Sequence, residues 1–369
     1  MADEQALRQT PLHRTHVAAG ARMVSFGGWD MPVQYADGII AEVRAVRQSA
    51  GMFDVSHMAR YQFVGPDAVE FLDRMIAADV AGLQPGRARY HVICNEQGGI
   101  IDDAIVYRIT DDQCLLVANA GNADAVLDWL LPSAQQNGGV FFADLTQDVA
   151  MIAVQGPEAV AIVDRLCPLP ASSVRPFRVR RAEIAGVPSR IARTGYTGED
   201  GFEIMPPADR AVELWRALEA EGVKPAGLGA RDVLRLEAGL MLHGNDMTVE
   251  NNPYEAGLDR FTYIDTPGYV AGGALRAIRD AGTPRVMTAF LMVGRGIPRH
   301  GLAVMKDGER VGAVTSGTHS PTLDANIGMG YVDRGLSAEG TRFEIDVRGR
   351  LVEAEVVPLP FYSRKRNQT

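Results

Sequence analysis

The sequence predicts a mixed α+β protein of two or three domains that ends in a small all-β domain. The chain has 369 residues, which is more than a single domain usually holds. Helical and strand patterns alternate between residues 58 and 140, as in a compact α+β unit. After residue 285 short strands alternate with Gly and Asp turns, which is typical of a β-barrel or sandwich. We therefore expect a domain boundary at residues 280–285, where Ala281-Gly282-Thr283-Pro284 lies between the two patterns.

Hydrophobic spacing and turn residues predict the individual elements. Residues 11–35 mix Gly, Pro and aromatic residues, which indicates strands joined by a turn rather than a long helix. Apolar residues at helical spacing predict helices over 39–49, 66–77, 123–131, 158–166, 208–220 and 228–239. Apolar and β-branched runs predict strands over 90–95, 100–109, 114–119, 149–154, 288–293, 302–306, 311–316, 327–332, 342–347 and 351–357.

Composition argues against several classes of protein. The formal net charge of -9 is unfavourable for binding nucleic acid or an anionic membrane. The 3 cysteines are far apart and form no CxxC motif, which predicts free thiols in a reducing compartment. Residues 1–10 carry no leader pattern, and no apolar run is long enough to span a membrane. We therefore expect a cytoplasmic protein that binds neither membrane nor nucleic acid.

Motifs for metal and nucleotide binding are absent or incomplete. The chain has no Walker A motif, no HExxH and no complete GxGxxG. His13 and His16 are close enough to share a helix face, but without a third ligand such a pair is more often structural. We expect no metal site.

Two adjacent carboxylates, Asp102 and Asp103, follow the Gly98-Gly99 turn at the start of a predicted strand. Neighbours in a strand point to opposite faces. One of the two should therefore point inward, where an ionised carboxylate is costly unless it is paired or used. The alternative is an Asp pair that closes the hairpin by binding nearby backbone amides. The segment by itself leaves both interpretations open.

A series of longer motifs makes the chain recognisable. They occur in this order: Phe26-Gly27-Gly28-Trp29-Asp30-Met31-Pro32-Val33-Gln34-Tyr35, Gly51-Met52-Phe53-Asp54-Val55-Ser56-His57-Met58, Gly98-Gly99-Ile100-Ile101-Asp102-Asp103, Gln155-Gly156-Pro157, Gly195-Tyr196-Thr197-Gly198-Glu199-Asp200-Gly201-Phe202-Glu203, Gly227-Leu228-Gly229-Ala230-Arg231-Asp232, Thr315-Ser316-Gly317 with Ser320-Pro321-Thr322-Leu323, and Pro360-Phe361-Tyr362. From about residue 10 to its end, the chain resembles the T-protein (aminomethyltransferase) family of the glycine cleavage system.

The resemblance implies three domains around a central channel that buries the pterin of tetrahydrofolate. Residues 1–50 and 145–282 would form a discontinuous folate-binding α+β domain. Residues 51–144 would form a ferredoxin-like α+β domain, and residues 283–369 a C-terminal β-barrel or jelly-roll-like domain.

The resemblance also implies the site residues. The second Asp of the Gly-Gly-x-x-Asp-Asp motif lies beside the reacting folate nitrogens, which makes Asp103 catalytic and Asp102 structural. Glu203 would accept two hydrogen bonds from the N–H and amino group on the pterin edge. The other implied folate-binding residues are Asn119, Arg231, Tyr90, Tyr362 and Arg364. Because folate ends in an anionic glutamate, we expect Arg231, Arg364 or another cation near the channel mouth.

The implied reaction moves the aminomethyl carbon from the sulfur of a dihydrolipoyl carrier (H-protein) to tetrahydrofolate and releases ammonia. The donor side departs from the family pattern. The usual Trp after Gly257-Leu258 and two lysines beyond it are missing, His243 replaces a common Tyr, and Ala59 replaces a usual Gly. An alternative is therefore a folate-dependent demethylase or one-carbon transferase of the same family that acts on a small methylated donor.

A third hypothesis is a folate-binding protein without catalysis, like the iron–sulfur-assembly relative of this fold. It is disfavoured because the Lys-Gly-Cys-type motif of that relative is absent and Asp103 is present.

Overall fold

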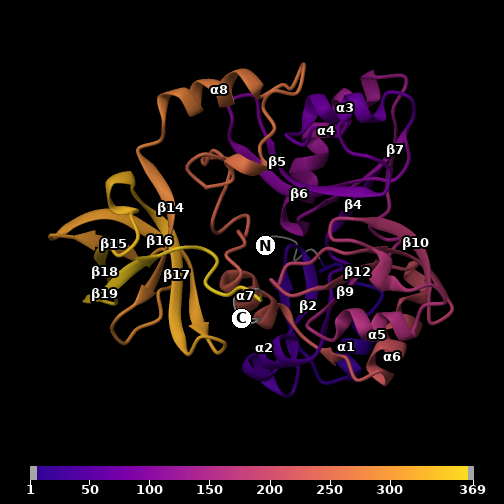
Figure 1. Ribbon diagram of the computed structural model, residues 1–369, viewed down its shortest axis with the longest axis horizontal. Helices are drawn as coiled ribbons and strands as arrows, with labels where there is room; N and C mark the ends of the chain where they lie inside the picture. The colour runs from indigo at the N-terminus through magenta and orange to yellow at the C-terminus, as the bar shows by residue number, and fades with distance from the viewer. Residues whose placement is uncertain (1–5, 365–369) are drawn as a thin grey trace.

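A computed structural model describes residues 6–364 and contains three β-sheets, a short hairpin and the helices that cover them (Figure 1). Residues 1–5, part of the stretch inspected for a leader, lie outside the described residues. None of the helices between residues 6 and 364 is long and apolar enough to cross a membrane.

The first sheet has six strands in the order β10-β11-β12-β9-β3-β13. Its strands are β3 (Gly51–Asp54), β9 (Ile152–Gln155), β10 (Val179–Ile184), β11 (Val187–Ala192), β12 (Gly201–Met205) and β13 (Lys224–Pro225). The helices beside it are α1 (His13–Ala18), α2 (Gly38–Gln48), α5 (Ala159–Arg165), α6 (Ala211–Ala220) and α7 (Leu228–Glu237). Met52 of β3 packs with α5 and α6, whereas its neighbour Phe53 packs with α2 and α7. The sheet is therefore buried on both faces.

The second sheet has five strands in the order β5-β6-β7-β4-β8. Its elements are β4 (Ala59–Val64), α3 (Ala68–Met75), β5 (Arg87–Cys94), β6 (Ile100–Arg108), β7 (Gln113–Ala118), α4 (Ala123–Gln136) and β8 (Phe141–Asp144). One face packs on α3 and α4 through Val106 and Leu116. The other face packs on the first sheet through Tyr107 and Leu115. This second contact brings β6 close to β12.

The third sheet is a closed barrel in the order β14-β17-β16-β15-β18-β19. Its strands are β14 (Arg285–Met292), β15 (Ala303–Lys306), β16 (Glu309–Ser320), β17 (Ala325–Asp333), β18 (Arg342–Val347) and β19 (Arg350–Val357). Helix α8 (Gly272–Ala281) leads into it from the second sheet (Figure 1). The smaller elements are β1 (Arg22–Phe26), β2 (Trp29–Gln34), η1 (Ala120–Asn122), η2 (Ala171–Ser173), η3 (Ala208–Arg210), η4 (Asp259–Phe261) and η5 (Arg334–Leu336).

The elements agree with the predicted pattern, with identifiable exceptions. Helix α4 runs beyond the predicted residue 131 and includes Pro132, because Leu130 and Ala134 continue its buried face. Strand β10 was not predicted, since its arginines obscure the alternation of buried and exposed positions. Helices α1 and α8 and strand β8 were not predicted either, and α1 lies within residues 11–35, where strands and a turn were expected. The predicted boundary at 280–285 coincides with the end of α8 and the start of β14.

The division into domains remains a prediction with one correction. Strand β3 pairs with β9 of the six-stranded sheet. Residues 51–54 therefore belong to that sheet, although the predicted boundary placed them in the 51–144 domain. Met52 and Phe53 point into two different apolar cores on opposite faces of the strand. The sequence alone does not show which sheet a strand buried on both faces belongs to.

Gly156 offers a test of this packing. Its φ is 138°, and a Cβ there would lie 2.3 Å from the Ser49 carbonyl oxygen. We expect Gly156→Ala to lower the free energy of unfolding by about 3 kcal/mol or more, because strain and a backbone clash add. Gly222 also has a positive φ but open space around it, so Gly222→Ala should cost only about 1 kcal/mol. Urea denaturation measures both, and equal losses would contradict the clash.

Candidate active site

A cavity of about 500 Å³ lies between the three sheets. The five-stranded sheet contributes Asp103 on β6, the six-stranded sheet contributes Glu203 on β12, and the barrel contributes Met287 on β14. Helix α7 adds Arg231, and the C-terminal segment adds Leu359 and Pro360. The volume is within the usual range of small-molecule sites.

The two carboxylates of β6 are both withdrawn from solvent. Asp102 is 0% exposed and Asp103 is 8% exposed. Asp103 lines the cavity, while Asp102 accepts hydrogen bonds from the Asn119 backbone N–H (2.9 Å) and from Asn122 Nδ2 (2.8 Å). Asn119 Nδ2 lies 2.9 Å from Oδ1 of each Asp and so connects them. Tyr90 donates its hydroxyl to Asp103 Oδ2 at 2.9 Å.

This arrangement adjusts the protonation of Asp103. Burial raises the pKa of Asp103 from the ordinary carboxyl value, and the negative charge of Asp102 raises it further. Burial also raises the pKa of Asp102, against the hydrogen bonds from Asn119 and Asn122. A carboxyl that can lose or regain a proton near neutral pH inside a cavity is suited to general acid–base work.

A second polar group of the cavity is formed by Glu203 and Arg231. Glu203 accepts hydrogen bonds from the Thr194 and Tyr107 hydroxyls, and burial raises its pKa. The Arg231 guanidinium lies 4.6 Å from the ring centre of Tyr196. Its Nη1 is shielded from solvent and makes no hydrogen bond within residues 6–364. The cavity therefore presents a carboxylate acceptor and an unpartnered cationic donor to a flat polar ligand.

The structure brings most of the predicted site residues together. The cavity lining includes Tyr90, Asp103, Asn119, Glu203 and Arg231.

Tyr362 and Arg364 are not in that lining. The Tyr362 ring lies 3.9 Å from the Arg47 guanidinium carbon, and Arg364 pairs with Asp200 at 3.4 Å. Tyr362 follows Pro360 closely in the chain, and Pro360 does line the cavity.

Other lining residues were not predicted. Tyr196 belongs to the Gly-Tyr-Thr-Gly motif, which could have indicated it. Phe177 has a φ of 55° and lies half-exposed in the lining, and a left-handed backbone is not visible in the sequence. Arg260 is an exposed cation in the lining, two residues after Leu258 in the segment that departs from the family pattern.

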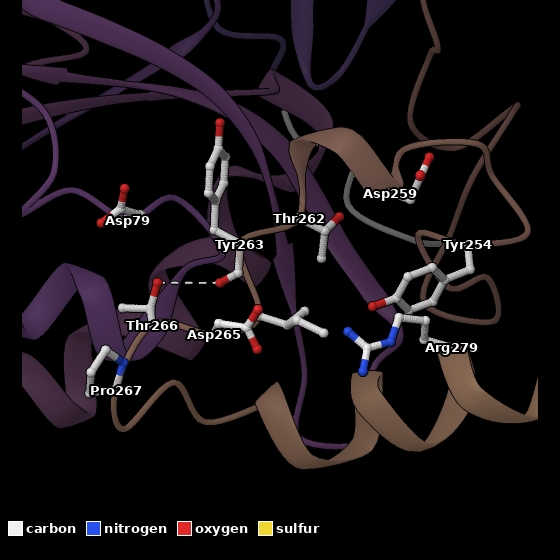
Figure 2. Close-up of a pocket in the computed structure, with 10 residues that line it drawn as sticks. Asp79, Tyr254, Asp259, Thr262, Tyr263, Asp265, Thr266, Pro267 and Arg279 are labelled. Carbon is white, nitrogen blue, oxygen red and sulfur yellow. Dashed lines mark hydrogen bonds between the residues drawn. The ribbon is translucent and has the colours of Figure 1, made fainter.

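A second, more open pocket of about 600 Å³ is lined in part by Asp259 and residues 262–267 (Figure 2). Within residues 257–263, Asp259 and Thr262 face the open pocket, whereas Leu258 and Phe261 face the enclosed cavity. The side chain of Asp265 in the open pocket is 87% exposed. Within residues 6–364 no group of three side chains could hold a metal ion. The buried carboxyls Asp103 and Glu203 line the first cavity and not this open pocket.

The fold and the cavity define an enzyme-like site in which one buried carboxyl, Asp103, faces the ligand space while its neighbour Asp102 does not. Comparisons with known proteins are specific. The GCVT N-terminal domain model matches residues 12–266, and the glycine cleavage T-protein C-terminal barrel domain model matches residues 285–363.

Full-length relatives agree with these matches. An aminomethyltransferase from Desulforamulus reducens is 44% identical over 365 residues, covering 98% of this chain and 100% of the relative. One from Saccharopolyspora erythraea is 45% identical over 363 residues, covering 97% and 98%. The crystal structure of the glycine cleavage system aminomethyltransferase T from Bartonella henselae superposes with a TM-score of 0.92 at 36% identity, covering 97% of this chain and 99% of that one.

The chain therefore belongs to the T-protein family of the glycine cleavage system. The predicted fold class, with its C-terminal barrel, is confirmed. The predicted enzyme class, an aminomethyltransferase, is also confirmed, and the alternative of a demethylase is not favoured.

The raised pKa of Asp103 predicts a pH-dependent stability. Its pKa rises from 3.8 to about 7 on folding. Within that window the folded state binds more protons than the unfolded state, so Asp103 lowers stability progressively as pH rises. Asn at this position does not titrate. We expect the free energy of unfolding of Asp103→Asn, relative to wild type, to increase across the window and then level off.

Urea denaturation at pH values below, within and above the window measures this. Asp111, whose side chain is 90% exposed in the loop between β6 and β7, provides the control Asp111→Asn, which should show no such trend. If the difference in the free energy of unfolding between Asp103→Asn and wild type did not change with pH, the raised pKa of Asp103 would be contradicted.

Proposed function

We propose that this protein transfers the carbon of an S-aminomethyl dihydrolipoyl group, presented by a lipoyl carrier protein, to tetrahydrofolate. The observation that carries the proposal is Asp103, a buried carboxyl with a raised pKa that faces an enclosed cavity. The relatives described above, an aminomethyltransferase and a glycine cleavage system aminomethyltransferase T, support the same reaction class.

In the proposed reaction two nitrogens of tetrahydrofolate form bonds to one carbon. That carbon loses its bonds to the lipoyl sulfur and to the amino nitrogen. The protons released from the two folate nitrogens end on the sulfur, as a thiol, and on ammonia. The products are 5,10-methylenetetrahydrofolate, the dihydrolipoyl carrier and ammonia, without any oxidant or reductant.

We assign to Asp103 the role of taking the proton from an attacking folate nitrogen, or of stabilising the cation that develops at the transferred carbon. Both roles require the carboxylate form. Tyr90 and Asn119 hold Asp103 in place through the hydrogen bonds described above. Asp102 does not line the cavity, and we propose that it anchors Asn119 and Asn122.

The second polar group of the cavity suits the pterin. A pterin edge presents neighbouring N–H donors, which a carboxylate such as Glu203 accepts as a pair. Its carbonyl oxygen is an acceptor that fits the unpartnered Nη1 of Arg231. We therefore propose that Arg231 contacts the pterin rather than the glutamate tail. We propose that Tyr362 and Arg364 contribute to folate binding from the C-terminal segment, which reaches the cavity at Leu359 and Pro360.

The remaining predictions stay proposals. We propose the three-domain division with residues 51–54 moved to the first domain, and a cytoplasmic location. The lipoyl carrier is the proposed partner.

Asp103→Asn tests the catalytic role. Without the carboxylate, turnover should fall by about 100-fold or more. Purified protein is assayed with tetrahydrofolate and aminomethylated lipoyl carrier while ammonia and methylenetetrahydrofolate are measured. Asp111→Asn should retain activity. Normal turnover in Asp103→Asn would refute the role assigned to Asp103. If the wild-type protein binds tetrahydrofolate tightly but shows no turnover, the proposal that the aminomethylated lipoyl carrier is the donor would be refuted.

Glu203→Gln tests the pterin contact. The amide loses one acceptor and the charge, so the dissociation constant of tetrahydrofolate should rise by about 10-fold or more. Equilibrium binding without the carrier measures this independently of turnover. Glu213, 51% exposed on α6, provides the control Glu213→Gln. An unchanged dissociation constant in Glu203→Gln would mean that the pterin does not contact this carboxylate.

A further inference from the structure

A buried ion cluster lies outside the cavity lining and joins four parts of the chain. Arg47 on α2 donates from Nη2 to Glu237 on α7 at 2.7 Å and from Nη1 to Glu199 at 2.7 Å. Its Nε makes a second bond to Glu237 at 3.0 Å, and its Nη1 also reaches the Thr197 carbonyl oxygen at 2.8 Å. The side chains of Arg47, Glu199 and Glu237 are 6%, 4% and 0% exposed. Ion pairs this deeply buried are costly unless every group is bonded.

The barrel and the C-terminal segment complete the cluster. Glu237 accepts hydrogen bonds from the Ser320 hydroxyl at 2.6 Å and the Thr322 hydroxyl at 2.9 Å, at the end of β16. The Tyr362 backbone N–H donates to the Glu237 carbonyl oxygen at 2.7 Å. The Tyr362 ring covers the Arg47 guanidinium at 3.9 Å. Such a stacked cation is favourable when shielded from water.

Each protein segment bonded to Arg47 continues directly into the cavity wall. Thr197 follows Gly195 and Tyr196, which line the cavity. Glu237 precedes the lining residues Ala238, Gly239 and Leu240.

The C-terminal segment also continues from its contact with Arg47 into the cavity wall. Tyr362 follows the lining residues Leu359 and Pro360. The contact between the walls is close, since a Cβ added at Gly239 would lie 2.9 Å from a Leu359 methyl. Arg47 itself does not line the cavity. Arg47 therefore connects three segments of the cavity wall from a position outside the cavity.

We propose that Arg47 is a positioning residue for folate binding, which fixes the loop at 195–199, the end of α7 and the C-terminal segment as one wall of the cavity. The proposal rests on the proposed function for the identity of the ligand. Arginine suits this task because its planar fork bonds both carboxylates and a carbonyl at once, which a lysine ammonium on a single stem cannot reproduce.

The test compares tetrahydrofolate binding and steady-state kinetics in Arg47→Lys. A wall displaced by a fraction of an ångström should raise the dissociation constant by about 10- to 100-fold. The KM for tetrahydrofolate should rise while kcat at saturation is retained, because Arg47 does not touch the reacting atoms. Binding is measured without the carrier, so a wrong donor assignment would abolish turnover and leave this readout intact.

Two further variants keep the test informative if Arg47→Lys folds poorly. Arg47→Gln combined with Glu199→Gln and Glu237→Gln removes all three charges of the cluster and avoids an unpaired buried carboxylate at either Glu199 or Glu237. Thr322→Val removes one hydroxyl donor at the edge of the cluster and should raise the dissociation constant by about threefold.

Two controls separate positioning from simple loss of stability. Arg165→Lys alters a surface pair with Glu221 at the ends of α5 and α6, the helices on the sheet face opposite α2 and α7, and should leave binding unchanged. Val163→Ala opens the core beneath α5 and should lower the melting temperature without changing the dissociation constant. Unchanged binding in the folded Arg47 variants, or an equal rise in Val163→Ala, would overturn the proposal.

Discussion

The site depends on the burial of two adjacent carboxylates in a strand that has no solvent-exposed face. β6 packs on helices on one side and on the six-stranded sheet on the other, so Asp102 and Asp103 must both leave water. Buried carboxylates need hydrogen-bond donors or protons. Asn119 and Asn122 supply donors to Asp102, and Asn119 and Tyr90 supply them to Asp103. Asp103 keeps a raised pKa because these donors only partly offset burial and the charge of its neighbour.

The packing of the three sheets also determines where the cavity lies. Three sheets packed on one another leave a space where their side chains diverge, and the segment 257–263 and the C-terminal residues 359–360 close it. Polar groups at such a place are shielded from bulk water, which strengthens their interactions with a ligand. Arg231 Nη1 is an example, since it is buried and makes no bond within the described residues. The ion cluster at Arg47 holds part of this wall from outside the cavity.

Much of the site could be predicted because it lies within local motifs. The Gly98-Gly99 turn and the strand after it indicate where Asp102 and Asp103 lie in the fold, and alternation predicts their opposite faces. The resemblance to the T-protein family supplied Glu203, Asn119 and Arg231. Tyr362 was predicted to bind folate; its ring lies on Arg47, outside the cavity lining, and its role in binding remains a proposal. Arg47 was not predicted, because an arginine in an amphipathic helix usually faces solvent and because its partners Glu199 and Glu237 are distant in sequence.

The sequence by itself determined the local elements, the C-terminal barrel strands, the carboxylate pair and, through its motifs, the family. These depend on short-range spacing, which the order of residues expresses directly. The tertiary structure decided which sheet β3 joins, how deeply both carboxylates are buried, and which charges meet behind the cavity. Those properties depend on contacts between residues such as Arg47 and Glu237, separated by 190 positions. Burial and the resulting pKa shifts follow from the packed surroundings, because desolvation is set by all the neighbours in space.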